Sequence, residues 1–179
     1  MSLALATLLP GLFLLALGLP LLLNHAGFVA ALKALPRSTG AAVVFFGAGA
    51  LWFLWAVLHL GPADFGEYRV WLAIGFAAVA VLSFKYAPDF LAVRGLCVLM
   101  LMSAVPLLAA AYMHYDQPQR LFMVTIVYIG VAVAIWWGAS PYRMRDFLGW
   151  LFALPARTRA FGGALVAYGL LLAGISFTY

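Results

Sequence analysis

The sequence predicts an all-α integral membrane protein with six transmembrane helices joined by short loops. The first observation is composition: of 179 residues, 68% are hydrophobic and only 8% are charged, whereas a soluble domain carries roughly 25% charged residues. The second is the mean hydropathy of +1.11. The third is length, because a spanning helix needs about 20 apolar residues and the chain contains six such runs. We therefore expect residues 1–179 to form a single six-helix transmembrane domain.

The apolar runs define the spans in chain order. We place them at residues 3–23, 40–60, 69–84, 92–112, 120–138 and 161–178. Pro10 and Pro20 fall in the first run and Pro106 in the fourth. Membrane helices tolerate proline where neighbouring groups bond the carbonyl that it leaves free. The first run has no basic residue before it, so we interpret it as a retained helix and not as a cleaved signal peptide.

Basic residues concentrate in alternate gaps between the spans. Eight of the ten Lys and Arg residues lie in or beside the first, third and fifth gaps, whereas the second and fourth gaps hold the acidic residues Asp64, Glu67 and Asp116. Short loops rich in Lys and Arg remain in the cytoplasm. The pattern therefore predicts a multi-pass protein of the cell inner (plasma) membrane, with both termini outside the cytoplasm. The predicted cytoplasmic interface consists of Lys33, Arg37, Arg143, Arg145, Arg157 and Arg159.

Two stretches of sequence resemble each other 119 positions apart. Residues 28–39 and 147–158 share a Phe, a Leu, an Ala-Leu-Pro triplet and a Thr at equivalent positions. Each predicts a short interfacial helix stopped by a Leu-Pro turn, because the residue before proline disfavours helical backbone. A shorter Asp-Phe-Leu match joins residues 89–91 to 146–148. These matches predict hairpin repeats around 24–60, 86–112 and 140–178; the alternative is chance, since Leu, Ala and Pro are frequent in such chains.

The net charge of +5 points to membrane lipids as partners of the basic residues, because those residues flank apolar spans. No basic face interleaved with aromatic residues lies away from the spans, so nucleic acid is not an expected partner.

Cys97 is the only cysteine, which excludes an intrachain disulfide and a cysteine-based metal cluster.

Histidine and tryptophan supply the candidate cofactor-binding residues. His59 ends the second span and His114 ends the fourth, and imidazoles at one depth can ligate a haem iron or the magnesium of a chlorophyll. Trp52, Trp55 and His59 are spaced i, i+3 and i+7 and therefore share one helical face, which suits a flat tetrapyrrole or quinone ring. The alternative is interfacial anchoring, for which Trp and His are common. No metal site is otherwise expected.

Small residues recur at helical spacing in the last two spans. Gly130, Ala134 and Gly138 occupy every fourth position of the fifth span, and Gly162 and Gly169 lie in the sixth. Such stripes let helix backbones approach closely in lipid. We favour packing within the bundle over a subunit interface for these residues.

The spans contain no Asp, Glu, Lys or Arg near their middles, although ion pathways and proton relays require ionisable groups there. No nucleophile–base pair, HExxH motif or phosphate loop occurs either, so we do not expect an enzyme. The leading hypothesis is a non-catalytic subunit, scaffold or accessory component of a larger inner-membrane complex of the energy-converting, respiratory or photosynthetic kind. The alternatives are a small carrier or channel for an apolar or lipid-like substrate, and a haem-, chlorophyll- or quinone-binding subunit.

Overall fold

The structure is a computed structural model that describes residues 1–179, and it contains helices but no strands. Six helices are long and apolar enough to cross a membrane, which confirms the all-α, six-span prediction. They are α1 (Leu3–Leu22), α3 (Thr39–Leu58), α4 (Arg69–Tyr86), α5 (Leu91–Ala111), α6 (Arg120–Ala139) and α8 (Pro155–Ser176). Two shorter helices, α2 (Ala26–Ala34) and α7 (Tyr142–Leu151), join spans, and three 3-10 turns are η1 (Leu35–Arg37), η2 (Pro62–Asp64) and η3 (Gly66–Tyr68).

Short polar side chains begin several of these helices. Ser2 accepts a hydrogen bond from the Leu5 amide at 3.3 Å, and Ser38 accepts one from the Ala41 amide at 3.2 Å. His25 caps α2 in the same way, because its Nδ1 accepts from the Phe28 amide at 3.3 Å. Each cap satisfies an amide that has no partner within its helix.

The structure corrects two details of the sequence prediction. Helix α8 begins at Pro155 and not at residue 161, so Arg157 and Arg159 lie within its first two turns. Proline suits this first position because its missing N–H would have had no helical partner. The second correction concerns Pro36, which does not end the helical backbone before it. Leu35 keeps helical backbone angles, and the chain continues as the 3-10 turn η1 to Arg37.

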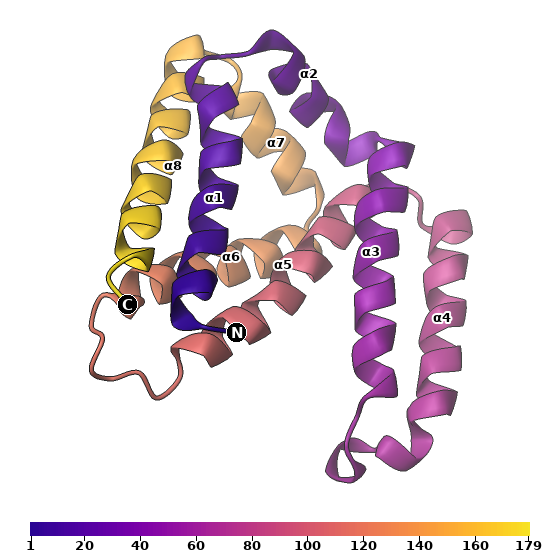
Figure 1. Ribbon diagram of the computed structural model, residues 1–179. Helices are drawn as coiled ribbons and strands as arrows, with labels where there is room; N and C mark the ends of the chain where they lie inside the picture. The colour runs from indigo at the N-terminus through magenta and orange to yellow at the C-terminus, as the bar shows by residue number, and fades with distance from the viewer.

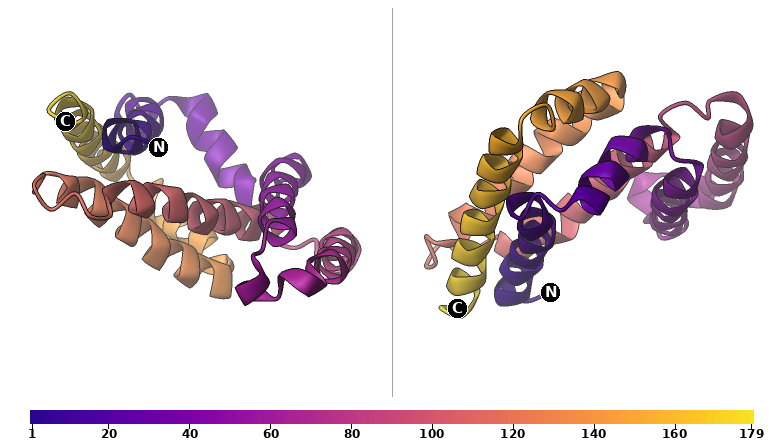
Figure 2. Two further views of the ribbon diagram at one scale, coloured as in Figure 1. Left: turned by 60° about the horizontal axis from the view of Figure 1, so that its bottom comes forward. Right: turned by 90° about the horizontal axis from the view of Figure 1, so that it is seen from above.

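The six spans are arranged as three side-by-side pairs (Figure 1). The first and last spans, α1 and α8, run antiparallel, and both chain termini lie at the same end of this pair. α3 and α4 form a second pair at the opposite side of the molecule, and α5 with α6 crosses between the two (Figure 2). α5 contacts α1, α3 and α6, so it is the helix that joins the three pairs into one body.

The interior is built where these pairs meet. A cluster of nine buried residues gathers side chains from α1, α5, α6 and α8, including Leu14, Met123 and Leu172. A second cluster packs α7 onto the adjoining ends of α5 and α6 through Val93, Ala134 and Leu148. Helix α4 contributes no buried residue to either cluster. A third cluster joins Ala42 of α3 to Leu91 and Ala92 of α5. Burial on α3 is thus on its α5 side, and α4 lies outside all three clusters.

Candidate functional site

The α3–α4 pair is held together by aromatic side chains. Phe46 meets Phe84 edge-to-face with ring centroids 5.5 Å apart, and Phe53 meets Phe76 in the same geometry at 5.0 Å. Such pairs contribute about 0.5–1.5 kcal/mol each beyond the area that they bury. They fix which side of α4 faces α3 and leave the opposite side exposed.

That opposite side forms a continuous surface, which we call the α4 outer face: Trp71, Ile74, Gly75, Ala78 and Leu82. All five residues are exposed, and Trp71 retains 74% of its accessible surface. Apart from the adjoining backbone of α4 itself, nothing in the chain comes within 4 Å of a Cβ built on Gly75. On this face the large Trp71 side chain stands next to a glycine without a side chain. Small residues of this kind let the backbone of another helix approach closely in lipid.

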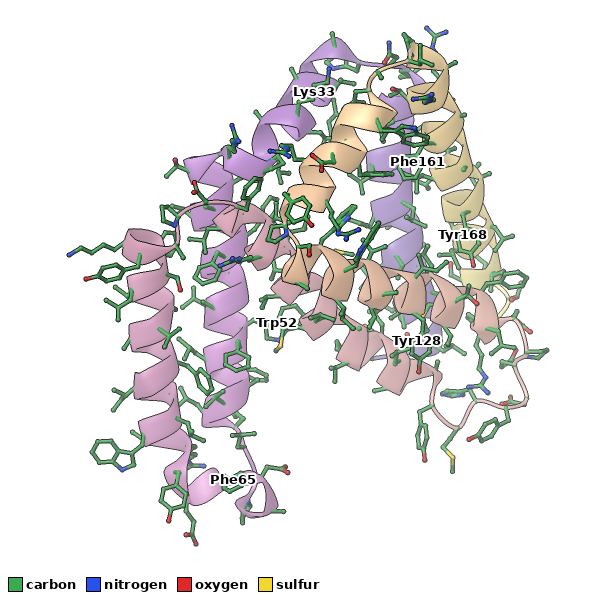
Figure 3. All side chains as sticks on the ribbon, turned by 180° about the vertical axis from the view of Figure 1, so that it is seen from behind. Lys33, Trp52, Phe65, Tyr128, Phe161 and Tyr168 are labelled. Carbon is green, nitrogen blue, oxygen red and sulfur yellow. The ribbon has the colours of Figure 1, made fainter.

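His59 and Trp55 lie together at the end of α3. Their ring centroids are 4.5 Å apart, and His59 Nδ1 lies 2.7 Å from the Trp55 carbonyl oxygen. A carbonyl can only accept, so Nδ1 carries the proton and donates it. The remaining nitrogen, Nε2, then presents its lone pair, as in a metal-ligating histidine whose other nitrogen bonds a carbonyl. Trp52 lies on the same helix, half-buried (Figure 3).

His114 does not join this group. It lies in the turn between α5 and α6, whereas His59 follows the end of α3. α3 and α5 touch in their first halves, where Gly49 and Gly95 approach each other, and their last turns separate widely (Figures 1 and 2). The two imidazoles therefore do not face one metal. No group of three or more His, Cys, Asp or Glu residues is placed to hold a metal ion.

The small residues of α6 face α5. Ala134 is completely buried. A Cβ on Gly130 would lie 3.7 Å from the Met100 Cε, and one on Gly138 would lie 3.7 Å from the Cys97 Cβ. These are ordinary contact distances, so the stripe lies within the bundle and sets the spacing of α5 and α6.

Gly162 and Gly169 of α8 face α1, where they meet two glycines that the sequence analysis did not single out. Gly18 lies opposite Gly162, and Gly11 lies opposite Gly169. The signal was available in the sequence, because each pair repeats at a spacing of seven residues, which is two helical turns. Together these four residues form a seam, which we call the glycine seam.

The predicted interface residues gather around α2, α7 and the start of α8, which we call the basic end. Lys33 lies over the Phe152 ring at 5.7 Å and Arg37 over the Phe90 ring at 5.9 Å. Arg143 lies over Trp136, and Arg157 lies over Trp150. Arg145 forms the one ion pair of the chain, with Asp146 at 2.8 Å. Arg159 is exposed on α8.

Two polar contacts at the opposite end of the molecule were also missed. Arg120 Nη1 donates to the Ala111 carbonyl oxygen at 2.6 Å and closes the loop between α5 and α6. Tyr168 on α8 donates its hydroxyl proton to the Phe122 carbonyl oxygen of α6 at 2.9 Å. Neither residue belongs to a recognisable motif, because each pairing depends on how distant helices approach.

Comparisons of the chain with protein-family models, with curated proteins and with solved structures found no match.

Proposed function

We propose that this chain is a non-catalytic membrane subunit, a scaffold or accessory component that binds a partner protein in the cell inner membrane through the α4 outer face. The observation that carries the proposal is the position of α4. This span has no buried residue, and α3 is the only other span against which it packs extensively. The proposed orientation places the basic end in the cytoplasm, following the distribution of Lys and Arg.

The mixture of small and large side chains on the α4 outer face supports a protein partner. Lipid chains cover any apolar surface, so exposed Leu or Val needs no partner helix. Helix association in lipid instead depends on close van der Waals contact at small residues. Gly75 and Ala78 supply two small residues on one face, and Trp71 stands beside them as an anchor. Large aromatic anchors next to a hollow are typical of the energetic centres of protein interfaces.

The polar groups of the interior support a structural role for the rest of the bundle. The buried polar side chains are Thr7, Thr158 and Ser176. Each donates to a carbonyl of its own chain, at 3.0 Å for Thr7, 3.1 Å for Thr158 and 2.6 Å for Ser176. The protons of these hydroxyls therefore find their acceptors within the chain. Energy-converting complexes remain the class of assembly that we favour.

The test compares two glycines that are equally free of contacts. Gly75 lies on the α4 outer face, and Gly174 lies near the end of α8; a Cβ on either meets no atom within 4 Å. Affinity-tagged protein is purified from native membranes in mild detergent as wild type, Gly75→Leu and Gly174→Leu. We expect a companion protein in fixed stoichiometry with the wild type and with Gly174→Leu, and its loss with Gly75→Leu. A wild-type chain that purifies alone, or equal recovery with both variants, would contradict the proposal.

A second candidate function is favoured by the hydrogen bond from His59 to the Trp55 carbonyl. With Nε2 left to coordinate, His59 could supply the single axial ligand of a chlorophyll or haem, with Trp52 and Trp55 beside the ring. The absorption spectrum of the purified protein tests this: a Soret or chlorophyll band should be present in the wild type and absent in His59→Ala. A colourless wild-type sample would remove the tetrapyrrole version.

A further inference from the structure

A shallow pocket of about 490 Å³, largely open to the surface, lies between the end of α6 and helix α7 at the basic end. Sites for small ligands have volumes of about 300–1,000 Å³, so this pocket is large enough to hold more than a single small ion. Its lining combines aromatic rings with one cation and one carboxylate: Trp136, Tyr142, Arg143, Asp146, Phe147 and Trp150.

The charges of this pocket favour an anion. Asp146 already accepts two hydrogen bonds on one carboxylate oxygen, from Arg145 Nε at 2.9 Å and from Arg145 Nη2 at 2.8 Å. No other ion pair exists in the chain, so the charge of Arg143 is not matched by a carboxylate. The charges of Arg145 and Asp146 cancel, so the positive charge of Arg143 remains on the pocket wall.

Aromatic rings hold the guanidinium groups at the pocket. The Arg143 guanidinium carbon lies 5.1 Å from the centre of the Trp136 ring and 5.9 Å from that of Tyr142. On the other side, Arg157 lies 4.9 Å over the Trp150 ring and donates to the Trp150 carbonyl oxygen at 3.3 Å. Stacking on a ring restricts the motion of a guanidinium. Its N–H groups, which lie in the plane of the guanidinium itself, remain free to donate to an acceptor. The pocket wall therefore holds one cation, Arg143, and a second cation, Arg157, lies against the wall residue Trp150.

We propose that this pocket binds the phosphodiester headgroup of an anionic phospholipid. The planar guanidinium of Arg143 matches two phosphate oxygens, and Trp136 and Trp150 lie against the glycerol and the first methylene groups. The pocket adjoins the last turn of α6, a helix long and apolar enough to cross a membrane, which ends at Ala139. Four of its six lining residues are hydrophobic, which suits a lipid better than a soluble phosphate ester.

The experiment measures binding to purified full-length protein in a neutral detergent. The probes are dioctanoyl-phosphatidylglycerol, dioctanoyl-phosphatidylcholine and glycerol 3-phosphate, and the readout is intrinsic tryptophan fluorescence, because Trp136 and Trp150 line the pocket. The variants are Arg143→Gln and Arg157→Gln. The control is Arg159→Gln, which removes the same charge from an exposed position on α8 outside the pocket.

We expect saturable binding of phosphatidylglycerol that is weakened about tenfold by Arg143→Gln, as the loss of a charge-assisted contact predicts, and is unchanged by Arg159→Gln. Arg157→Gln should weaken binding as well, and it provides the test if Arg143→Gln fails to fold. Equal losses with all three variants would show general electrostatic attraction and overturn the site. Glycerol 3-phosphate or phosphatidylcholine binding as tightly as phosphatidylglycerol, or no saturable binding at all, would also overturn it.

Discussion

Gly18 and Gly162 meet backbone to backbone: a Cβ on either residue would lie 2.9 Å from the carbonyl oxygen of the other. Real Cβ atoms essentially never come this close to a neighbour, so neither position can hold a side chain without moving a helix. Gly11 and Gly169 repeat the contact two turns along, at 3.1 and 2.9 Å. The glycine seam thus brings the first and last spans together and closes the chain on itself.

Gly162→Ala should therefore destabilise the protein. The new Cβ would strike the backbone of Leu21 and Leu22, and forcing a methyl group into a packed contact costs about 1–3 kcal/mol. The thermal midpoint in detergent should fall by several degrees. Gly174→Ala is the matched control on the same helix, because its Cβ meets nothing within 4 Å, and its midpoint should stay the same or rise slightly. Equal midpoints for the two variants would contradict the seam.

Tyr168→Phe should weaken the contact between α8 and α6. The variant loses the hydroxyl that donates to the Phe122 carbonyl oxygen, and such bonds between membrane helices contribute about 0.6 kcal/mol on average. Tyr128→Phe is the control, since Tyr128 is 59% exposed and its hydroxyl makes no hydrogen bond (Figure 3). Reversible unfolding in mixed micelles should separate the two variants. A Tyr128→Phe loss as large as that of Tyr168→Phe would refute the assignment.

Arg120→Gln should loosen the loop between α5 and α6. Arg120 binds the Ala111 carbonyl and lies 4.8 Å over the Tyr115 ring, so it ties the start and the middle of this loop to α6. Losing a hydrogen bond to a charged group costs about 1.5–3 kcal/mol. Amide hydrogen exchange of residues 112–119 should accelerate about tenfold or more. Arg69→Gln, at the start of α4, is the control and should leave that loop unchanged; unaltered exchange in Arg120→Gln would contradict this role.

The orientation predicted from Lys and Arg can be tested by labelling single cysteines in intact cells. Cys97 is only 3% exposed, and Cys97→Ser provides the background. A membrane-impermeant maleimide should label Asp64→Cys from outside and should label Arg159→Cys only after permeabilisation. Labelling of both positions from one side would mean that the number of spans between them is wrong, and the reverse pattern would mean that their direction is wrong.

The sequence was sufficient for the class of fold, because hydropathy and helix length are properties of single segments. The six spans and two connecting helices follow from apolar runs separated by charged gaps. The start of α8 was misplaced because Arg157 and Arg159 are polar, although long arginine side chains can extend from a helix toward the headgroups. Hydropathy does not encode how a charged first turn packs.

The pairing of helices was less accessible. Gly162 was recognised as a packing residue, but its partner Gly18 is remote in the chain, and only the shared seven-residue spacing of the two glycine pairs links them. The exposure of α4 is likewise a consequence of where the other spans lie, since α4 is about as apolar as α8, which carries buried residues. Trp55 and His59 could be placed on one helical face from their spacing, whereas the separation of His59 from His114 depended on the divergence of α3 and α5.

The most direct test of the account is photo-crosslinking from the α4 outer face. A benzoylphenylalanine residue replaces Trp71, and in a control protein it replaces Phe13 on α1, which is 58% exposed. After irradiation of native membranes, we expect the Trp71 variant alone to give a discrete adduct with a second protein. Adducts with lipid only at both positions, or identical protein adducts from both, would contradict the proposal that α4 docks a specific partner.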